Sequence, residues 1–186
     1  MTPRLIRPRR FTDDRGWFSE TYNRAVFNDL GITDEFVQDN HSRSLTRGTL
    51  RGLHCQTAPH VQAKLVRCIR GAIFDVAVDL RRASPTFGKW VAATLTAERG
   101  EQLYVPGGYG HGFMTLTDET EVIYKCSSLY APECEAGVIW NDMQIAIDWP
   151  LDRPEPLLSE KDRNLPPLRA FTAEFPYDGI PLAPLD

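Results

Sequence analysis

In two segments of this sequence, apolar and polar residues alternate, and in each a titratable side chain occupies a position on the apolar side. Lys64 lies on the same side as Val66, and Tyr124 lies on the same side as Val122. Such exceptions are informative because charged or titratable groups rarely occupy the buried face of a strand without a role. Lysine and tyrosine are among the residue types that acid–base chemistry uses. Each also has an ordinary structural interpretation, an edge-strand lysine that reaches water and a core tyrosine whose hydroxyl is bonded.

Two further residues of this kind, His54 and Asp162, lie in segments with marked local patterns. His54 follows Gly52, which permits close approach of the backbone, in the run Leu50–Gln56. Asp162 ends the run Ser159–Asp162, and a Ser-x-x-Asp pattern resembles the capping box that starts a helical turn. A structural histidine and a helix cap therefore stay open, and none of the four residues determines function alone.

Neither metal nor phosphate chemistry has a recognisable motif here. The histidines are His41, His54, His60 and His111. No His-x-His pair occurs, so the spacing does not support a metal site. A P-loop and a Gly-x-Gly-x-x-Gly run are also absent. Arginines would therefore have to hold a phosphate, and the candidates by abundance are Arg15, Arg43, Arg47, Arg51, Arg67 and Arg70.

The composition limits the kind of protein that positions these residues. The 186 residues carry 21 Lys plus Arg against 25 Asp plus Glu, a net charge of −4, which argues against a nucleic-acid-binding domain. We find no secretory signal and no run of about 20 apolar residues, so we expect a cytoplasmic protein that does not enter a membrane. Without a Cys-x-x-Cys pair, we expect free buried thiols at Cys55, Cys68, Cys126 and Cys134.

Period-two alternation predicts short strands, and the 14 prolines and 13 glycines leave little room for long helices. The expected strands are Lys64–Ile69, Ala72–Leu80, Trp90–Thr96, Gln102–Val105, Gly112–Leu116, Glu121–Ser127 and Val138–Trp140. Many short strands in one chain of this size predict an all-β antiparallel sandwich or jelly roll.

One early helix is also expected. Asn23 can cap it, Gly31 can end it, and one face would carry Val26, Phe27 and Leu30.

Ten segments, taken in order, carry a resemblance that covers about residues 3 to 165. They are Asp14–Glu20, Phe36–Ser42, Leu50–His54, Lys64–Cys68, Phe74–Asp79, Ser84–Gly88, Pro106–Phe113, Tyr124–Lys125, Trp140–Asp142 and Leu158–Asp162. Together they resemble the dTDP-4-dehydrorhamnose 3,5-epimerase family. The resemblance implies a cupin-like double-stranded β-helix, a jelly roll with short peripheral helices. We expect one domain over residues 1–186, with an N-terminal arm over about 1–20 and a Pro-rich C-terminal tail over about 150–186.

The chemistry that the resemblance implies needs no cofactor and no metal. The substrate would be a dTDP-4-keto-6-deoxy sugar, whose C4 ketone acidifies the protons at C3 and C5. Each centre would lose a proton and regain one on the opposite face. That task requires a base on one side of the ring, an acid on the other and positive charge at the developing enolate oxygen.

The resemblance assigns these roles to four residues. His54 matches the base, and Asp162 matches the aspartate that pairs with it and fixes its tautomer. Tyr124 matches the acid on the opposite face. Lys64 matches a lysine near the C4 oxygen, which explains why a lysine interrupts an apolar strand face.

Substrate-binding residues and a partner are implied in the same way. Tyr130 matches an aromatic side chain that stacks on thymine, and the Arg15 segment matches an arm that reaches across a homodimer. The other matches in the nucleotide-sugar site are Glu20, Gln38, Asn40, Arg51, His111, Glu135 and Lys161.

Two positions depart from the family pattern. The loop Ser42–Thr49 is one residue longer than the commonest form, and Cys55 occupies a position that is usually aromatic. A cysteine there either widens the pocket or alters the packing beside His54.

Three other functions stay open at this point. A relative that epimerises a single centre would share the catalytic residues. A non-catalytic jelly roll would bind thymidine diphosphate without catalysing solvent exchange. A metal-dependent cupin oxygenase would contain stoichiometric iron.

Overall fold

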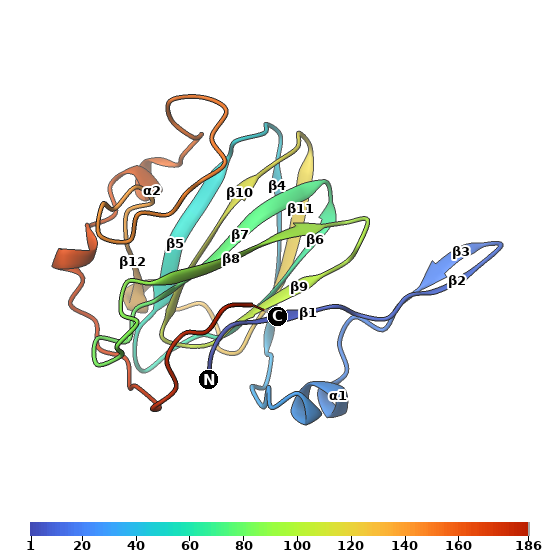
Figure 1. Ribbon diagram of the computed structural model, residues 1–186, viewed down its shortest axis with the longest axis horizontal. Helices are drawn as coiled ribbons and strands as arrows, with labels where there is room; N and C mark the ends of the chain where they lie inside the picture. The colour runs from blue at the N-terminus through green and yellow to red at the C-terminus, as the bar shows by residue number, and fades with distance from the viewer. Residues whose placement is uncertain (186) are drawn as a thin grey trace.

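The computed structural model describes residues 1–185, and two five-stranded antiparallel sheets face each other in it (Figure 1). The first sheet has the order β1 (Arg4–Ile6), β9 (Gln102–Val105), β6 (Lys64–Arg70), β11 (Thr120–Cys126) and β4 (Gln38–Ser44). The second has the order β12 (Glu135–Gly137), β5 (Leu50–Gln56), β10 (Tyr109–Thr115), β7 (Ala72–Asp79) and β8 (Trp90–Thr96). This arrangement is the jelly roll that the sequence predicted.

Alternate side chains from both sheets fill the space between them. Val66 and Cys68 of β6 pack in one apolar cluster with Ile73 and Ala77 of β7. Because successive side chains of a strand point to opposite faces, the even-numbered residues of β6 and the odd-numbered residues of β7 face this interior. Lys64 and Asp75 share these faces, on strands of opposite sheets.

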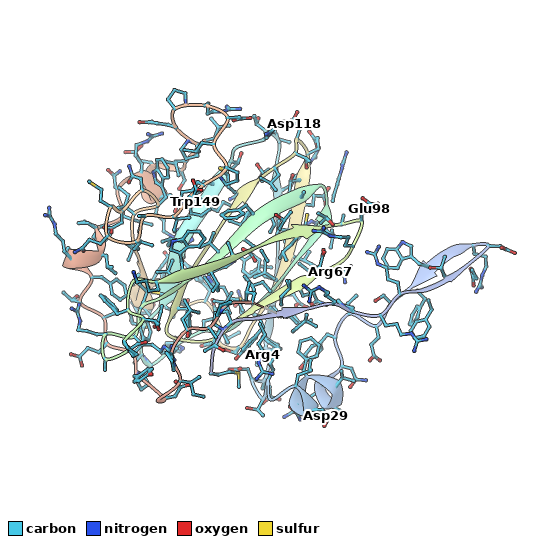
Figure 2. All side chains as sticks on the ribbon, viewed as in Figure 1. Arg4, Asp29, Arg67, Glu98, Asp118 and Trp149 are labelled. Atoms are coloured by element: carbon cyan, nitrogen blue, oxygen red, sulfur yellow. The ribbon has the colours of Figure 1, made fainter. Side chains whose placement is uncertain are left out.

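The chain after β12 covers the outer face of the second sheet. Val76 and Val78 pack there with Trp149, Phe171 and Phe175 in a second apolar cluster, and Figure 2 shows Trp149 beside this sheet. The short helices are η1 (Pro132–Cys134), α2 (Glu160–Arg163) and η2 (Leu168–Ala170). Within residues 1–185, we find no helix with the length and hydropathy of a membrane span.

A two-stranded arm leaves the body of the molecule near its N-terminus. Strands β2 (Phe11–Asp13) and β3 (Gly16–Phe18) pair with each other alone, and Figure 1 shows this hairpin projecting away from both sheets. All six residues are exposed. The hairpin therefore presents aromatic rings to solvent at the end of the arm.

The early helix forms as α1 (Arg24–Asp29), with Asn23 as its N-cap and Gly31 just after its end at a φ of +78°. The expected apolar face is wrong, because only Phe27 of that set is buried, while Val26 and Leu30 are exposed. A helix of six residues lies at the surface and reaches the core through one side chain.

Most of the expected strands are confirmed, and β8 and β9 have the predicted bounds. The expected strand Val138–Trp140 is wrong. The pairing with β5 ends at Val138, whose backbone bonds Leu53 in both directions, and Ile139 then donates to the carbonyl of Pro166. The chain turns there toward its C-terminal segment and leaves the sheet.

Strand β10 begins three residues before the expected start at Gly112. Tyr109 and Gly110 pair with β7, and a side chain at position 110 would press on Leu80. Gly110 makes the alternation hard to recognise in the sequence, but it is the residue that allows Leu80 to pack closely on β10.

The C-terminal tail is tied to the body by an ion network. The guanidinium of Arg81 donates to the Asp79 carboxylate at 2.9 Å and to Asp178 at 2.9 Å. Asp178 also pairs with the amino group of Met1. The side chains of Arg81 and Asp79 are 3% and 0% exposed, so this pair lies inside the protein, whereas Asp178 lies at the surface.

Candidate active site

A pocket of about 330 Å³ opens between the two sheets and collects most of the predicted site residues. Its walls include the four residues that the resemblance made catalytic. The lining comprises Ser42, Arg51, His54, Lys64, His111, Phe113, Tyr124, Tyr130, Glu135, Ser159, Lys161 and Asp162.

His54 and Asp162 form a hydrogen-bonded pair in this pocket. Nε2–H of His54 donates to Oδ1 of Asp162, which leaves Nδ1 with its lone pair. Burial alone would raise the pKa of Asp162, but the hydrogen bond and charge of His54 outweigh it, so this pKa lies below its usual range. The carboxylate is therefore ionised at neutral pH and orients the imidazole.

The N-cap of α2 places Asp162 beside His54. Ser159 is the N-cap of α2, and its Oγ accepts from the backbone N–H of Asp162 at 3.1 Å. The backbone of Asp162 thus serves the cap while its carboxylate reaches His54. Asp162 is therefore part of a capped helical turn and also the hydrogen-bond partner of His54.

His54 is placed by a close approach of β5 to β10. The register sets His54 opposite His111. Gly52 has a φ of +128°, and a Cβ there would lie 2.5 Å from Cα of Gly112. Only glycine fits this conformation and this spacing, so Gly52 fixes the distance between the two strands.

Tyr124 and Lys64 enter the pocket from the opposite sheet. Burial raises the pKa of the Tyr124 phenol, which is therefore protonated at neutral pH. Burial lowers the pKa of the Lys64 ammonium. A potential base on β5 and a potential acid on β11 thus face one cavity from two sides, as proton exchange on both faces of a ring requires.

His111 and Arg51 line the same cavity. Nε2–H of His111 donates to Oδ1 of buried Asp75 at 2.6 Å, and burial lowers the pKa of His111. Arg51 is held by the hydroxyl of Ser44 at 3.3 Å and by the carbonyl of Arg43. Its guanidinium adds positive charge to the wall.

Four residues at the rim are linked by hydrogen bonds. Gln38 Oε1 accepts from the backbone N–H of Tyr130 at 2.9 Å, and the Tyr130 hydroxyl donates to Glu135 at 3.2 Å. Glu135 also pairs with Lys161. Tyr130 as a residue is 55% exposed, so its ring stays available for stacking.

Two predicted binding residues do not reach this pocket within one chain. Arg15 is exposed on the projecting arm and pairs with Asp13 at 2.5 Å. Glu20 accepts from Asn23 at the base of the arm. Asn40, by contrast, lies on the pocket face of β4 with Ser42, where its Oδ1 accepts from Gln38 at 3.1 Å and its Nδ2 donates to Sγ of Cys126 at 3.4 Å.

Sequence reasoning missed Asp75, Ser42, Phe113 and Ser159 as parts of the site. A signal existed for Asp75, because a carboxylate between Ile73 and Ala77 breaks an apolar strand face just as Lys64 does. The other face of that strand, Phe74 to Leu80, is entirely apolar, so alternation predicts that side as the buried one.

All four cysteines are free and buried, as predicted. Cys55 packs in the apolar cluster with Val138, on the side of β5 away from the pocket, and burial raises its pKa to about 12. The departure at this position therefore alters core packing. Among residues 1–185, no group of three or more His, Cys, Asp and Glu side chains converges as metal ligands do.

Comparison with known proteins gives the family. The family model described as dTDP-4-dehydrorhamnose 3,5-epimerase matches residues 3–170. The enzyme of that name from Pseudomonas aeruginosa is 54% identical over 161 residues, which cover 86% of this chain and 87% of the relative.

Solved structures agree with this relationship. The Bacillus anthracis epimerase with TDP and PPi bound is 50% identical, with a TM-score of 0.86 and coverage of 89% of this chain and 93% of the other. The Legionella pneumophila epimerase in complex with dTDP-4-keto-L-rhamnose is 42% identical, with a TM-score of 0.88 and 94% coverage of both chains. A 3'-monoepimerase from Streptomyces bikiniensis in complex with dTDP-quinovose is 40% identical, with a TM-score of 0.83 and coverage of 90% and 84%. The chain belongs to the dTDP-4-dehydrorhamnose 3,5-epimerase family and is an isomerase that acts on a nucleotide sugar.

Proposed function

We propose that the chain converts dTDP-4-dehydro-6-deoxy-D-glucose to dTDP-4-dehydro-L-rhamnose with the side chains of this pocket and without a cofactor. The observation that carries the proposal is the placement of His54 and Tyr124 on facing sheets around one cavity. The C4 ketone of the sugar makes the C3 and C5 protons acidic enough for a neutral imidazole to remove.

His54 is the base in this proposal. Nδ1 takes the proton from the carbon, and the imidazolium that forms is stabilised by the ionised Asp162 on the other nitrogen. Tyr124 then donates its phenolic proton to the opposite face of the same carbon, which inverts the centre. The imidazolium then releases its proton to water and the Tyr124 phenolate takes one up, so that the two steps can be repeated at the second carbon to complete the reaction.

Positive charge stabilises the enolate that forms between these steps. The C4 oxygen gains charge when the carbon loses its proton, and Lys64 supplies an ammonium at that oxygen. Arg51 adds a second cation to the pocket from β5 of the facing sheet. A fixed charge in a site shielded from water stabilises such an oxyanion more than the same charge in solution would.

The rim would hold the nucleotide. Tyr130 stacks on thymine, while Gln38, Glu135 and Lys161 fix the orientation of the ring through the hydrogen bonds described above. His111 contacts the sugar from the floor of the cavity.

Deuterium exchange tests the reaction. The protein is incubated with dTDP-4-keto-6-deoxyglucose in deuterium oxide, and proton NMR follows the C3 and C5 signals. Loss of both signals with formation of the rhamno configuration supports the proposal. Binding of thymidine diphosphate without exchange would instead identify a non-catalytic binding protein.

A second candidate is epimerisation of one centre alone. The resemblance to the Streptomyces bikiniensis 3'-monoepimerase, at 40% identity over 90% of this chain, favours it specifically. The same NMR experiment decides between the two, because a monoepimerase inverts only C3.

We also propose that the chain works as a homodimer in which the arm completes the partner's site. The support is the projection of the arm away from both sheets in Figure 1, together with its exposed aromatic side chains, Phe11, Trp17 and Phe18. In a dimer of this kind, Arg15 and Glu20 would contact the nucleotide bound by the other subunit.

Mixing two inactive variants tests this assembly. His54→Ala keeps the arm but lacks the base, and Arg15→Ala keeps the base but lacks the cation of the arm. Each mixed dimer would contain one intact site, so activity should rise when the two proteins are mixed and allowed to exchange subunits. Activity that stays at the average of the two variants would exclude a site shared between subunits.

The chain would act as one functional domain in the cytoplasm. Four free buried thiols support this location, because such thiols are typical of a reducing compartment. Fractionation of the producing cells with an antibody against the protein tests it.

A further inference from the structure

Asp75 is a carboxylate on the apolar interior face of β7. It is 0% exposed and lies between Ile73 and Ala77 on that face. Oδ1 accepts from Nε2–H of His111, but Oδ2 is buried without a hydrogen-bond partner in residues 1–185. Burial of a carboxylate with half of its acceptor capacity unused is costly, so the stability of the fold does not account for this residue.

Lys64 is the cation that faces this carboxylate from the other sheet. Its side chain points into the same interior, and in the described part of the chain no hydrogen bond or salt bridge engages its ammonium. The charge of Asp75 acts on Lys64, and the charges of Asp75 and Lys64 both act on His111. The three residues therefore form one electrostatic unit at the floor of the pocket.

We infer that Asp75 is a positioning residue for the reaction: it is the fixed counter-charge that keeps Lys64 in its ammonium form, and it holds the His111 ring by one nitrogen. The inference rests on the proposed role of Lys64 at the C4 oxygen. It extends that role by naming the group that maintains the charge in an apolar interior.

The other groups around Lys64 are less suited to this task. The charged or titratable groups that line the pocket are His54, Asp162, Glu135, Lys161, Arg51, Tyr124 and His111, and the thiols of Cys55 and Cys126 lie outside the pocket but near enough to act on Lys64. Asp162 is paired with His54, and Glu135 is paired with Lys161. Burial raises the pKa of both thiols, which are therefore neutral. Asp75 is the buried carboxylate that retains an unbonded oxygen.

The arrangement has a chemical advantage for an enolate. Burial favours the neutral amine of Lys64, whereas the nearby negative charge of Asp75 favours the ammonium. Since the ammonium makes no hydrogen bond inside the protein, it keeps its donors for the substrate oxygen. Lys64 is thus charged without being tied to an acceptor that would compete with the enolate.

The experiment compares Asp75→Asn with Asp75→Ala. Asparagine keeps an oxygen that accepts from His111 but removes the charge, and alanine removes both. We expect kcat of Asp75→Asn to fall about 10- to 100-fold, since a weakened charge at the oxyanion is felt in the chemical step. KM and the binding of thymidine diphosphate should stay unchanged. The alkaline limb of the kcat profile should move to lower pH, because Lys64 then loses its proton more easily.

Three comparisons make the result specific. Asp29→Asn removes an exposed charge on α1, which Figure 2 shows outside the two sheets, and should leave the profile unchanged. His111→Gln keeps the charge of Asp75 and should not move the alkaline limb to lower pH. In a Lys64→Gln background, Asp75→Asn should cause no further loss of kcat.

Two results would overturn the inference. One is an alkaline limb of the kcat profile that does not move in a folded Asp75→Asn protein. The other is a kcat of the Lys64→Gln, Asp75→Asn double variant that is lower than that of Lys64→Gln alone. These outcomes are read against the wild-type protein. Absence of exchange in the wild type contradicts the proposed function itself, whereas an active wild type with an unmoved limb contradicts only the role of Asp75.

Discussion

The hydroxyl of Ser159 accepts a hydrogen bond from the backbone N–H of Asp162 at 3.1 Å, and this contact fixes the first turn of α2. The carboxylate of the same aspartate meets His54. A helix cap therefore holds one member of the proposed acid–base pair in place.

Removal of this cap should affect stability and rate together. Ser159→Ala is expected to lower the free energy of unfolding by about 1 kcal/mol, the usual cost of a lost N-cap. Asp162 would then be less well oriented, so kcat should also fall several-fold. Urea unfolding and the NMR exchange assay measure the two effects, and Ser159→Thr, which keeps the cap, serves as control. An unchanged kcat in the alanine variant would show that the cap does not orient the pair.

The pKa of Asp162 gives a prediction for acid stability. Because this pKa is lower in the folded protein than in the unfolded chain, its contribution to stability is present above the unfolded pKa and is lost as pH falls through the folded pKa. The wild type should therefore lose stability below about pH 4, the ordinary range of an aspartate. Asp162→Asn should show a shallower decline, measured by urea unfolding at a series of pH values. Equal slopes for the two proteins would contradict the lowered pKa.

Tyr124→Phe should separate proton removal from inversion. His54 still exchanges the carbon proton on its own face, while the opposite face has lost its donor. We expect deuterium exchange with retained configuration and a loss of product of at least about 100-fold. Tyr130→Phe is the matched control, since it keeps a ring for stacking and should change KM more than kcat. Full inversion in Tyr124→Phe would assign the acid to another residue.

Gly52→Ala tests the close approach of β5 to β10. A methyl group would lie 2.5 Å from Cα of Gly112 and 2.7 Å from the carbonyl oxygen of His111, at a φ that favours glycine. The strands would have to separate, at a cost of about 3 kcal/mol. Thermal unfolding measures the loss. Gly179→Ala, also at positive φ but with nothing within 4 Å, is the control for backbone strain alone.

Asp79→Asn should be among the most destabilising changes outside the pocket. Burial alone would raise the pKa of Asp79, but hydrogen bonds from Arg81, Ser84 and Thr86 hold it below its usual range. Loss of the carboxylate leaves the buried guanidinium of Arg81 without its main partner, which costs about 3–5 kcal/mol. Urea unfolding should show this loss, while kcat of the folded fraction stays normal. A cost below about 1 kcal/mol would mean that Asp178 alone can balance Arg81.

The sequence predicted the fold best where one period dominates. Alternation placed β6 to β9 because each has one apolar side, and resemblance supplied the jelly roll. Strand β4 carries polar side chains along its whole length, and Arg51 and Gly52 break the pattern of β5, so neither was placed by alternation. Strands β4 and β5 are held by hydrogen bonds to β11 and β10, which are distant from them in sequence, so local patterns do not reveal them.

The sequence also predicted some residues of the candidate site and not others. Matched motifs named His54, Lys64, Tyr124 and Asp162, and the structure brings them around one pocket. No local pattern could show that Arg15, in the turn between β2 and β3, lies outside the pocket, because this depends on where the hairpin projects. Asp75 was not predicted because alternation indicates one buried face, whereas both faces of β7 are covered in the structure.

The separation of His54 and Asp162 by 108 residues has a consequence for synthesis on the ribosome. Strand β12 ends at Gly137, so a nascent chain can contain every strand of both sheets before Asp162 has been translated. Such a chain has its pocket walls but an imidazole with no carboxylate to orient it. The acid–base pair can therefore form only after α2 has been translated, because a chain that ends before Ser159 lacks the carboxylate that orients His54.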